Sequence, residues 1–232
     1  MARLTTLICA ADPAGSEEAT AALIGAAEHH DAGAIAVVGE LGAAGDGPAS
    51  LRAVLRALGR SDRPVFWVPG PGDAPVGAYL REAHNTEVVF PSVHGVHGTA
   101  AISPGGDVVV AGLGGEISDN PAEPREEVDR LRYPRWEAEY RLKILNELPE
   151  LERVLLFHSH PQHKGLGTEG SEAVAELIGT YRARIAVCGG ERRCAMLGTT
   201  LVVAPGSAHD GHYAVVDVQR REAELAELAS AP

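Results

Sequence analysis

The feature of this sequence that most restricts its fold is a repeated pairing of an apolar run with a loop of glycine, proline, acidic residues or histidine. Ala34–Val38 is apolar throughout and continues into Gly39-Glu40, and Val154–Phe157 continues into a histidine-rich loop. A strand that is covered on both faces is apolar at every position. Between such runs lie amphipathic segments, such as Leu51–Leu58, with apolar residues at helical spacing. The alternation predicts an α/β fold in which helices cover the strands.

The other elements that we expect follow the chain in order. Strands are expected at Leu4–Ala10, Pro64–Val68, Glu87–Phe90, Val96–Ser103, Asp107–Ala111, Arg184–Cys188, Cys194–Leu197, Leu201–Ala204 and Tyr213–Val218. Helices are expected after the N-cap Ser16, around Tyr79 to Ala83 with Asp73 as the cap, from about Arg135 to Leu148, and from Glu172 to Tyr181. Gly112–Pro134 is expected to be a long polar loop, and the tail from Arg220 a polar, frayed helix. The strand-rich end predicts two sheets packed face to face, in one domain over residues 1–232.

Composition and charge exclude several classes of protein. The formal net charge of -12 argues against a nucleic-acid duplex or an anionic membrane as the partner, because both need a basic face. No apolar run has the length of a membrane span, and the N-terminus is too weakly apolar for a signal peptide. Cys9, Cys188 and Cys194 show no CxxC spacing, so reduced thiols are expected. These features predict a cytoplasmic protein.

The stretch Leu155–Ser171 has the highest density of reactive side chains. His158, His160 and His163 follow a buried strand, and Lys164 precedes a glycine-rich turn. Ligands bind beyond the carboxyl ends of strands in open α/β sheets, and imidazole is the commonest transition-metal ligand. Backbone amides of the glycine-rich turn could also receive an anion. The alternative is a polar loop whose histidines are solvated, which is favoured for His160 and His163.

Five of the expected strands end in loops of this kind. These loops hold Asp12, Glu40, Asp73, His158 and Gly189-Gly190. A layered sheet would bring the loops together along one edge. Asp12 could instead cap its own turn, and for Asp73 the role of a helix cap is favoured.

The order of these loops, Asp-x-x-Gly, Gly-acid, Gly-x-x-Asp, His and Gly-Gly-x-Arg, resembles that of the calcineurin-like metallophosphoesterases. The resemblance covers about Leu4 to Val218, and the segments VPGPGDAP, GGEISD, LRYPRWEAEYRLK and HKGL are similar to one divergent bacterial branch. It implies a four-layer α/β/β/α sandwich of two packed mixed sheets with flanking helices. It also implies metal ions that position a phosphate ester and activate a water for attack.

The metal-ligand pattern of that family is only partly present. Asp12, Glu40 and His158 stand at ligand positions of the resembled pattern. Other positions of that pattern hold residues that bind no metal there: Ala14, Pro71, Gly72, Gly190 and Arg192. Three protein ligands suffice for one metal ion. The resemblance therefore implies a reduced site for one divalent ion or none, and the donors suit Mn, Fe, Zn or Ca.

The remaining roles follow from the same resemblance. His160 or His163 is the candidate general acid or base. Arg192 and Lys164 are the candidate phosphate ligands, since a guanidinium binds phosphate bidentately. Arg192 could also be a solvated loop residue.

Two functions follow, and the sequence leaves both open. The first is a metal-dependent hydrolase of a phosphate mono- or diester with low activity. The second is a catalytically inactive relative that binds a phosphate-containing ligand or a protein partner. A metallo-β-lactamase-like hydrolase, suggested by His158-Ser159-His160, is disfavoured because no Asp-His pair follows. The expected partner is a small phosphorylated ligand, and the oligomeric state, including a homo-oligomer, is open.

Overall fold

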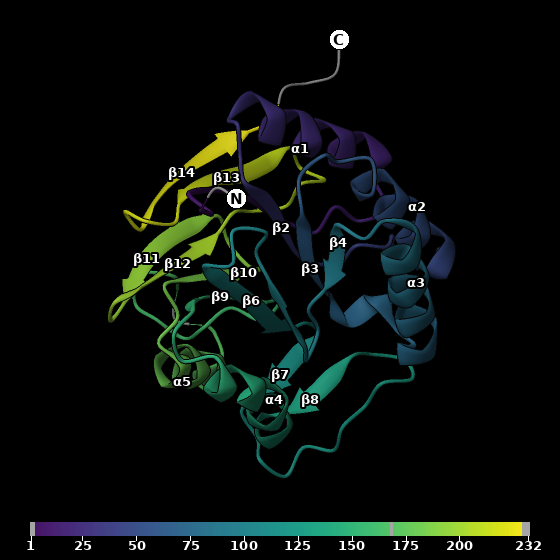
Figure 1. The fold of residues 1–232 in the computed structure, drawn as a ribbon. Helices are drawn as coiled ribbons and strands as arrows, with labels where there is room; N and C mark the ends of the chain where they lie inside the picture. Colours follow the sequence, from purple (N-terminus) through teal and green to yellow (C-terminus); the bar gives the residue numbers. More distant parts are fainter. Residues whose placement is uncertain (1–2, 168, 229–232) are drawn as a thin grey trace.

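The strands of this protein form two large sheets that pack face to face. The computed structural model describes residues 3–167 and 169–228. Each large sheet has six strands, and a third sheet of two strands lies at one end (Figure 1). Within the described residues, no helix combines the length and the apolar character that crossing a membrane requires.

The first sheet has the strand order β14-β13-β1-β2-β3-β4. Its strands are β1 (Thr6–Ala11), β2 (Ala34–Gly39), β3 (Val65–Pro69), β4 (Val93–Gly95), β13 (His212–Asp217) and β14 (Glu222–Glu227). The first four are parallel, and β13 and β14 continue the sheet in antiparallel fashion. Because β1, β2 and β3 point the same way, the loops that follow them lie at one edge of the sheet.

The second sheet has the strand order β11-β12-β10-β9-β6-β5. Its strands are β5 (Ala100–Ile102), β6 (Val108–Leu113), β9 (Glu152–Phe157), β10 (Ile185–Cys188), β11 (Arg193–Leu197) and β12 (Thr200–Ala204). The four central strands are parallel, and the edge strands β5 and β11 are antiparallel to their neighbours. The predicted hairpin on either side of Pro104-Gly105-Gly106 is confirmed as β5 and β6.

Three buried layers of apolar side chains hold the sheets and helices together. Between the sheets, residues such as Val38 and Val68 face residues such as Val110 and Leu156. The outer face of the first sheet packs on α1 (Glu17–His29), α2 (Pro48–Leu58) and α3 (Val76–Val89). The outer face of the second sheet packs on α4 (Arg135–Leu142) and α5 (Glu172–Tyr181). The two groups of helices lie on opposite sides of the sheets, so the predicted four-layer α/β/β/α sandwich is confirmed (Figure 1).

Local sequence signals explain several helix boundaries. The Ser16 side chain accepts a hydrogen bond from the Ala19 N–H at 3.1 Å and caps α1, as predicted. Gly59 ends α2, and α5 spans the predicted residues. The predicted helix from Arg135 is shorter than expected, because Lys143–Glu147 forms a 3-10 helix, η2.

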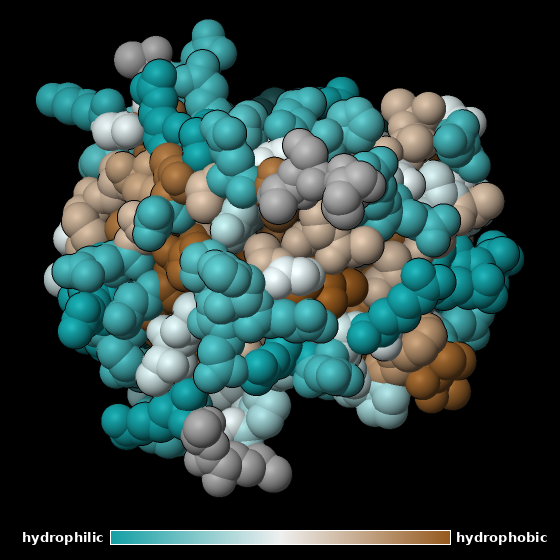
Figure 2. Space-filling model, turned by 90° about the horizontal axis from the view of Figure 1, so that it is seen from above, coloured by the Kyte–Doolittle hydropathy of each residue, from teal (hydrophilic) through white to brown (hydrophobic). Residues whose placement is uncertain are grey.

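Hydrophilic residues cover most of the face seen from the α1 side, with hydrophobic residues in scattered patches (Figure 2).

Two predictions between residues 73 and 90 are wrong. Asp73 ends a short 3-10 helix, η1 (Pro71–Asp73), and does not cap the helix that follows, because Pro75 is the N-cap of α3. The predicted strand Glu87–Phe90 is the last turn of α3. Its valines, Val88 and Val89, are 69% and 65% exposed on the helix surface, so the apolar pair did not signal a buried strand.

The predicted frayed helix after Arg220 is also wrong. Glu222–Glu227 forms β14 and pairs along its whole length with β13. Ala223 and Leu225 pack against the core between the sheets, while Glu222 and Glu224 are exposed. This alternation has the period of a strand, although Ala, Glu and Leu are good helix formers. Residues 229–232 of the predicted tail lie outside the described part of the chain.

The predicted loop Gly112–Pro134 contains regular structure. Glu116–Ser118 forms β7 and Arg132–Pro134 forms β8, and the two strands are parallel neighbours. We call residues 114–134 the arm. The arm crosses the open end of the sandwich near the carboxyl ends of β3 and β9, since the Gly115 N–H donates to the Pro69 carbonyl at 2.8 Å and the Ile117 N–H donates to the Ser159 hydroxyl at 3.1 Å.

Candidate active site at the carboxyl ends of the strands

Asp12 and His158 meet where the two large sheets come together. Asp12 directly follows β1 of the first sheet, and His158 directly follows β9 of the second. His158 Nε2 lies 3.8 Å from Asp12 Oδ1. Gly39, at the end of β2, makes this approach possible: a Cβ there would lie 2.0 Å from Asp12 Oδ1 and 2.9 Å from His158 Cδ2. Its φ of +97° is also one that side-chain-bearing residues rarely adopt.

The backbone of the first loop turns the Asp12 carboxylate toward the second loop. Asp12 has a left-handed φ of +46°, which Asp tolerates better than most residues. Its Oδ1 accepts a hydrogen bond from the Glu40 N–H at 2.8 Å. Burial raises the pKa of Asp12, and the neighbouring His158 and the Glu40 N–H oppose that rise. The carboxylate is thus partly desolvated but has a donor and an imidazole beside it.

Glu40 belongs to the same cluster, but its carboxylate faces the third loop. Oε1 and Oε2 accept the Gly72 N–H at 2.9 and 3.0 Å. A Cβ at residue 72 would lie 2.7 Å from Glu40 Oε2, so the glycine at this position leaves room for this carboxylate. Burial raises the pKa of Glu40, while the Gly72 N–H, His158 and Arg130 lower it. The charges of Asp12, His158 and Arg130 all act on this group.

Asp73 holds the loops of the cluster in place. It is 6% exposed, and its carboxylate accepts the N–H groups of Leu41, Gly42 and Gly70 at 3.0, 2.8 and 3.0 Å. Burial raises the pKa of Asp73 to about 7, against the effect of these three donors. Since its oxygens are bound by backbone groups, Asp73 ties the second loop to the third.

A cleft of about 590 Å³ opens beside His158. The strand ends contribute His158, Ser159, His160 and Gly190, and the arm contributes residues 116–119, Arg130 and Arg132. His160 contacts the Glu169 carbonyl through Nε2. The cleft therefore brings together His158 and His160, as the sequence predicts. The residues of the arm that line its other side were not predicted from the sequence.

The arm places two arginines at this cleft. Arg130 pairs with Glu116 at 2.8 Å, and Arg132 pairs with Glu116 at 3.2 Å and with Glu123 at 2.8 Å. The position of Arg130 is set by Glu126, whose carboxylate accepts the N–H groups of Val128, Asp129 and Arg130 at 3.0, 2.9 and 3.1 Å. In the sequence, the only indication of a role for Arg130 and Arg132 was their place in a long polar loop.

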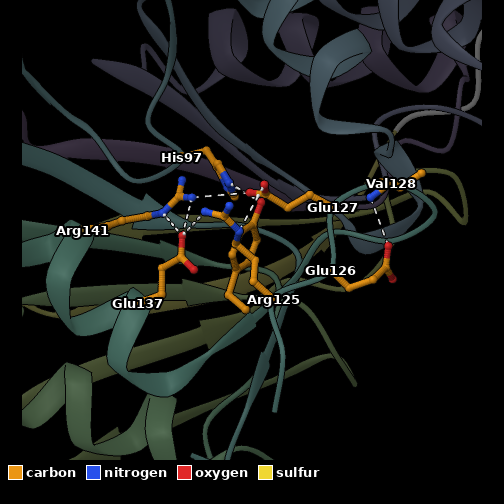
Figure 3. A network of polar contacts seen from close by, with 8 residues as sticks. His97, Arg125, Glu126, Glu127, Val128, Glu137 and Arg141 are labelled. Atoms are coloured by element: carbon orange, nitrogen blue, oxygen red, sulfur yellow. Dashed lines mark hydrogen bonds and ion pairs between the residues drawn. The ribbon is translucent and has the colours of Figure 1, made fainter. Parts of the chain in front are cut away.

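A polar network ties the arm to the sandwich (Figure 3). Arg141 of α4 pairs with Glu137 at 2.6 Å and with Glu127 of the arm at 3.4 Å. Arg125 of the arm pairs with the same two carboxylates at 3.4 and 3.5 Å. The two arginines and two glutamates thus link the arm to α4 and hold the arm in position beside the cleft.

His97 forms the buried end of this network. Its Nδ1 accepts the Gly114 N–H at 3.0 Å, and its Nε2 lies 3.0 Å from the Tyr133 hydroxyl, so His97 contacts both ends of the arm. Burial lowers the pKa of His97 to about 3, with Arg141 acting in the same direction. The imidazole is neutral at the pH values where proteins usually work.

Three predicted site residues lie elsewhere. His163 and Lys164 line a separate cleft of about 530 Å³ with Gln162 and Gly167. The Arg192 guanidinium donates to the Ala226 carbonyl of β14 at 3.1 Å. The structure thus separates all three from the cleft that holds His158 and His160.

The donors fit a metal site only in part. Within residues 3–167 and 169–228, no group of three or more His, Cys, Asp and Glu side chains is arranged to hold a metal ion. Asp12 and His158 supply two adjacent donors, and the third, Glu40, has both oxygens on the Gly72 N–H. The types of donor suit a divalent ion.

The chain is similar to known proteins in both sequence and fold. A family model described as metallophosphoesterase, calcineurin superfamily, matches residues 47–228. The crystal structure of TT1561 of Thermus thermophilus superposes with a TM-score of 0.92 at 38% identity, covering 98% of this chain and 100% of that one. No curated protein matches the chain.

Two more distant structures share the fold. A novel archaeal phosphodiesterase has a TM-score of 0.57 at 9% identity, with 96% of this chain and 99% of that chain covered. A dimetal phosphatase from Danio rerio has a TM-score of 0.60 at 10% identity, with 98% and 100% covered.

Proposed function

Because this chain belongs to the calcineurin superfamily of metallophosphoesterases, we propose that it hydrolyses a phosphate mono- or diester at a reduced site for one divalent ion. The observation that carries the proposal is the approach of His158 to Asp12 at 3.8 Å, beside a cleft that holds a second imidazole and two arginines. A cleft of about 590 Å³ has the size of a small-molecule site.

Asp12, Glu40 and His158 would hold the ion. An ion bound there would polarise the phosphoryl group and lower the pKa of a water. Glu40 could contribute while it accepts the Gly72 N–H at 2.9 and 3.0 Å, because a carboxylate has about four lone-pair sites and this single donor leaves some of them for an ion. The donors suit Mn, Fe, Zn or Ca.

His160 is the general acid or base in this proposal. It lines the same cleft as His158, whereas His163 lines another. His160 Nε2 contacts the Glu169 carbonyl, so a shift of Glu169 would free it for proton transfer. Its place in the cleft makes it the better candidate of the two predicted histidines.

Arg130 is the best-placed cation for the phosphoryl oxygens. Its charge acts on Glu40, and its guanidinium lines the cleft while pairing with Glu116. Arg192 and Lys164, which the sequence favoured for this role, have their charged groups at β14 and in a separate cleft. An arginine fork held by one carboxylate keeps donors for a phosphate.

The second candidate is a protein that binds a phosphorylated ligand without turnover. The observation in its favour is that Asp12, Glu40 and His158 do not form a ready three-donor cluster in the described part of the chain. In that case the arginines of the arm would carry the binding, and a chelator would leave the affinity unchanged.

Turnover of bis(p-nitrophenyl) phosphate separates the two candidates. Protein stripped of metal is incubated in turn with Mn, Fe, Zn and Ca and compared with His158→Ala treated alike. Hydrolysis that needs an added ion and is lost in the variant supports the hydrolase. No turnover above the variant with any ion, together with ligand binding that survives a chelator, supports the binding protein.

A further inference from the structure

A second cleft lies at the opposite end of the sandwich from His158. Its volume is about 510 Å³, and it is lined by the start of β9, the end of α5, the start of β10 and the turns that precede β12 and β14. His158 follows the carboxyl end of β9, and Glu152 and Arg153 begin the strand. The six steps from Glu152 to His158, at about 3.3 Å each, place the two clefts roughly 20 Å apart along the strand.

Arginines dominate the wall of this cleft. Arg153, Arg182, Arg184 and Arg221 line it, and among the described residues of the lining Glu152 is the only acidic one. Glu152 pairs with Arg184 at 2.9 Å. In the described part of the chain, no carboxylate lies within ion-pair distance of the other three arginines. Such a local excess of positive charge stands out in a chain with a net charge of -12.

Two of the four guanidinium groups are fixed by the backbone. Arg153 donates to the Tyr181 carbonyl at 2.7 Å and to the Leu145 carbonyl at 3.0 Å. Arg184 donates to the carbonyls of Val218 and Gln219. Carbonyl oxygens orient a guanidinium without neutralising it, so Arg153 keeps its full charge, whereas the charge of Arg184 is offset by Glu152. The cleft is therefore a preorganised positive site.

The other two arginines retain donors for a ligand. Arg221 sits in the turn between β13 and β14, and its buried Nε has no hydrogen-bond partner within the described residues. Arg182, at the C-cap of α5, is exposed at the rim. Within the described residues, no hydrogen bond or ion pair occupies the terminal nitrogens of Arg182 or Arg221, so both guanidinium groups keep donors for an oxyanion.

We propose that this arginine-lined cleft binds a multiply charged oxyanion, namely the phosphate group of a small molecule. Planar guanidinium forks match phosphate oxygens in geometry and charge. A volume of about 510 Å³ leaves room for more than the phosphate group itself. The site does not depend on the hydrolytic cleft, because none of its residues lies at the carboxyl ends of the strands.

The test uses inorganic phosphate as the probe and the full chain as the protein. Isothermal titration calorimetry at constant ionic strength compares the wild type with Arg182→Gln, Arg221→Gln and the double variant. These two positions are chosen because Arg153 and Arg184 also hold backbone carbonyls, and their loss would weaken the fold. Arg220→Gln is the matched control, since Arg220 neighbours Arg221 but pairs with Asp217 outside the cleft. His158→Ala reports binding at the other cleft.

The expected result is a dissociation constant for phosphate raised about tenfold or more in the double variant, which corresponds to about 1.4 kcal/mol, with Arg220→Gln unchanged. Thermal melting without phosphate shows whether each variant folds. If the double variant does not fold, the binding measurement uses the two single variants. Absence of binding to wild type at millimolar phosphate overturns the proposal. So does binding that His158→Ala abolishes and the arginine variants retain. Neither result bears on the proposed hydrolase activity, which the bis(p-nitrophenyl) phosphate assay tests separately.

Discussion

Asp12 Oδ1 and His158 Nε2 lie 3.8 Å apart, although one residue follows a strand of the first sheet and the other a strand of the second. No local motif produces this contact. It exists because the two sheets pack face to face with the carboxyl ends of β1 and β9 at the same edge, and because Gly39 leaves the space between them open. The site is thus a product of the sandwich as a whole.

Gly39→Ala is predicted to separate these two side chains. The added Cβ would lie 2.0 Å from Asp12 Oδ1, and alanine at a φ of +97° is strained. We expect a loss of about 2 to 4 kcal/mol in the free energy of unfolding and a loss of turnover. Chemical denaturation and the bis(p-nitrophenyl) phosphate assay measure the two effects.

The matched control for that variant is Gly25→Ala. Gly25 lies within α1, and a Cβ there meets nothing within 4 Å. This substitution should raise the free energy of unfolding by about 0.5 to 1 kcal/mol and leave turnover unchanged. If Gly39→Ala behaved like Gly25→Ala, the close approach at residue 39 would not support the site.

Arg130→Gln is predicted to weaken substrate binding. The arginine lines the cleft and acts on Glu40, and a charge-assisted contact to a phosphoryl oxygen is worth about 1.5 to 3 kcal/mol. Because the side chain is 56% exposed, we expect the lower end, a rise in KM of about tenfold. Arg63→Gln, which breaks a surface pair with Asp31, is the control and should leave KM unchanged. An unchanged KM in Arg130→Gln would show that Arg130 of the arm does not take part in substrate binding.

Arg192→Gln distinguishes a structural role from the role in phosphate binding that the sequence predicts. Since the guanidinium donates to the Ala226 carbonyl of β14, the variant should lose about 1 kcal/mol of stability with KM unchanged. Thermal melting and steady-state kinetics give both quantities. A higher KM at unchanged stability would show that Arg192 turns into the cleft after all.

The buried His97 should make stability depend on pH. Its folded pKa of about 3 lies below the ordinary value of 6.5, so its contribution is fully present above pH 6.5 and is lost as the pH falls toward 3. Protonation would place a hydrogen on Nδ1, which now accepts the Gly114 N–H. Between pH 6.5 and 5 this one group should lower the free energy of unfolding by about 2 kcal/mol.

His97→Gln provides the reference for this measurement. Glutamine does not titrate, so the variant should be less stable at pH 7.5 but should lose less stability than wild type on acidification to pH 5. Urea denaturation at both pH values gives the difference. Equal losses in the two proteins would mean that His97 is not held neutral by the arm.

Much of the sandwich could be predicted from local patterns. Continuous apolar runs such as Ala34–Val38 marked the buried strands, and Ser16 and Gly59 marked helix ends. The strand ends also placed Asp12, Glu40 and His158 correctly relative to the sheets. These features depend on periodicity and on backbone chemistry near each residue.

The remaining features depend on contacts between distant residues. The arm is held in place by the contacts of His97 with Tyr133 and Gly114, and the hydrophobic periodicity of the sequence does not predict such contacts. β14 consists of good helix formers and is a strand because β13 offers it an edge. For Arg192, the loop position was readable from the sequence, but the direction of the guanidinium depends on β14.

Metal content tests the central claim most directly. Protein purified without a chelator is analysed for bound elements, alongside Asp12→Ala and His158→Ala prepared in the same way. The account predicts about one equivalent of a divalent metal per wild-type chain and its loss in both variants. Wild-type protein that binds no divalent metal, even after incubation with Mn, Fe, Zn or Ca, would contradict it.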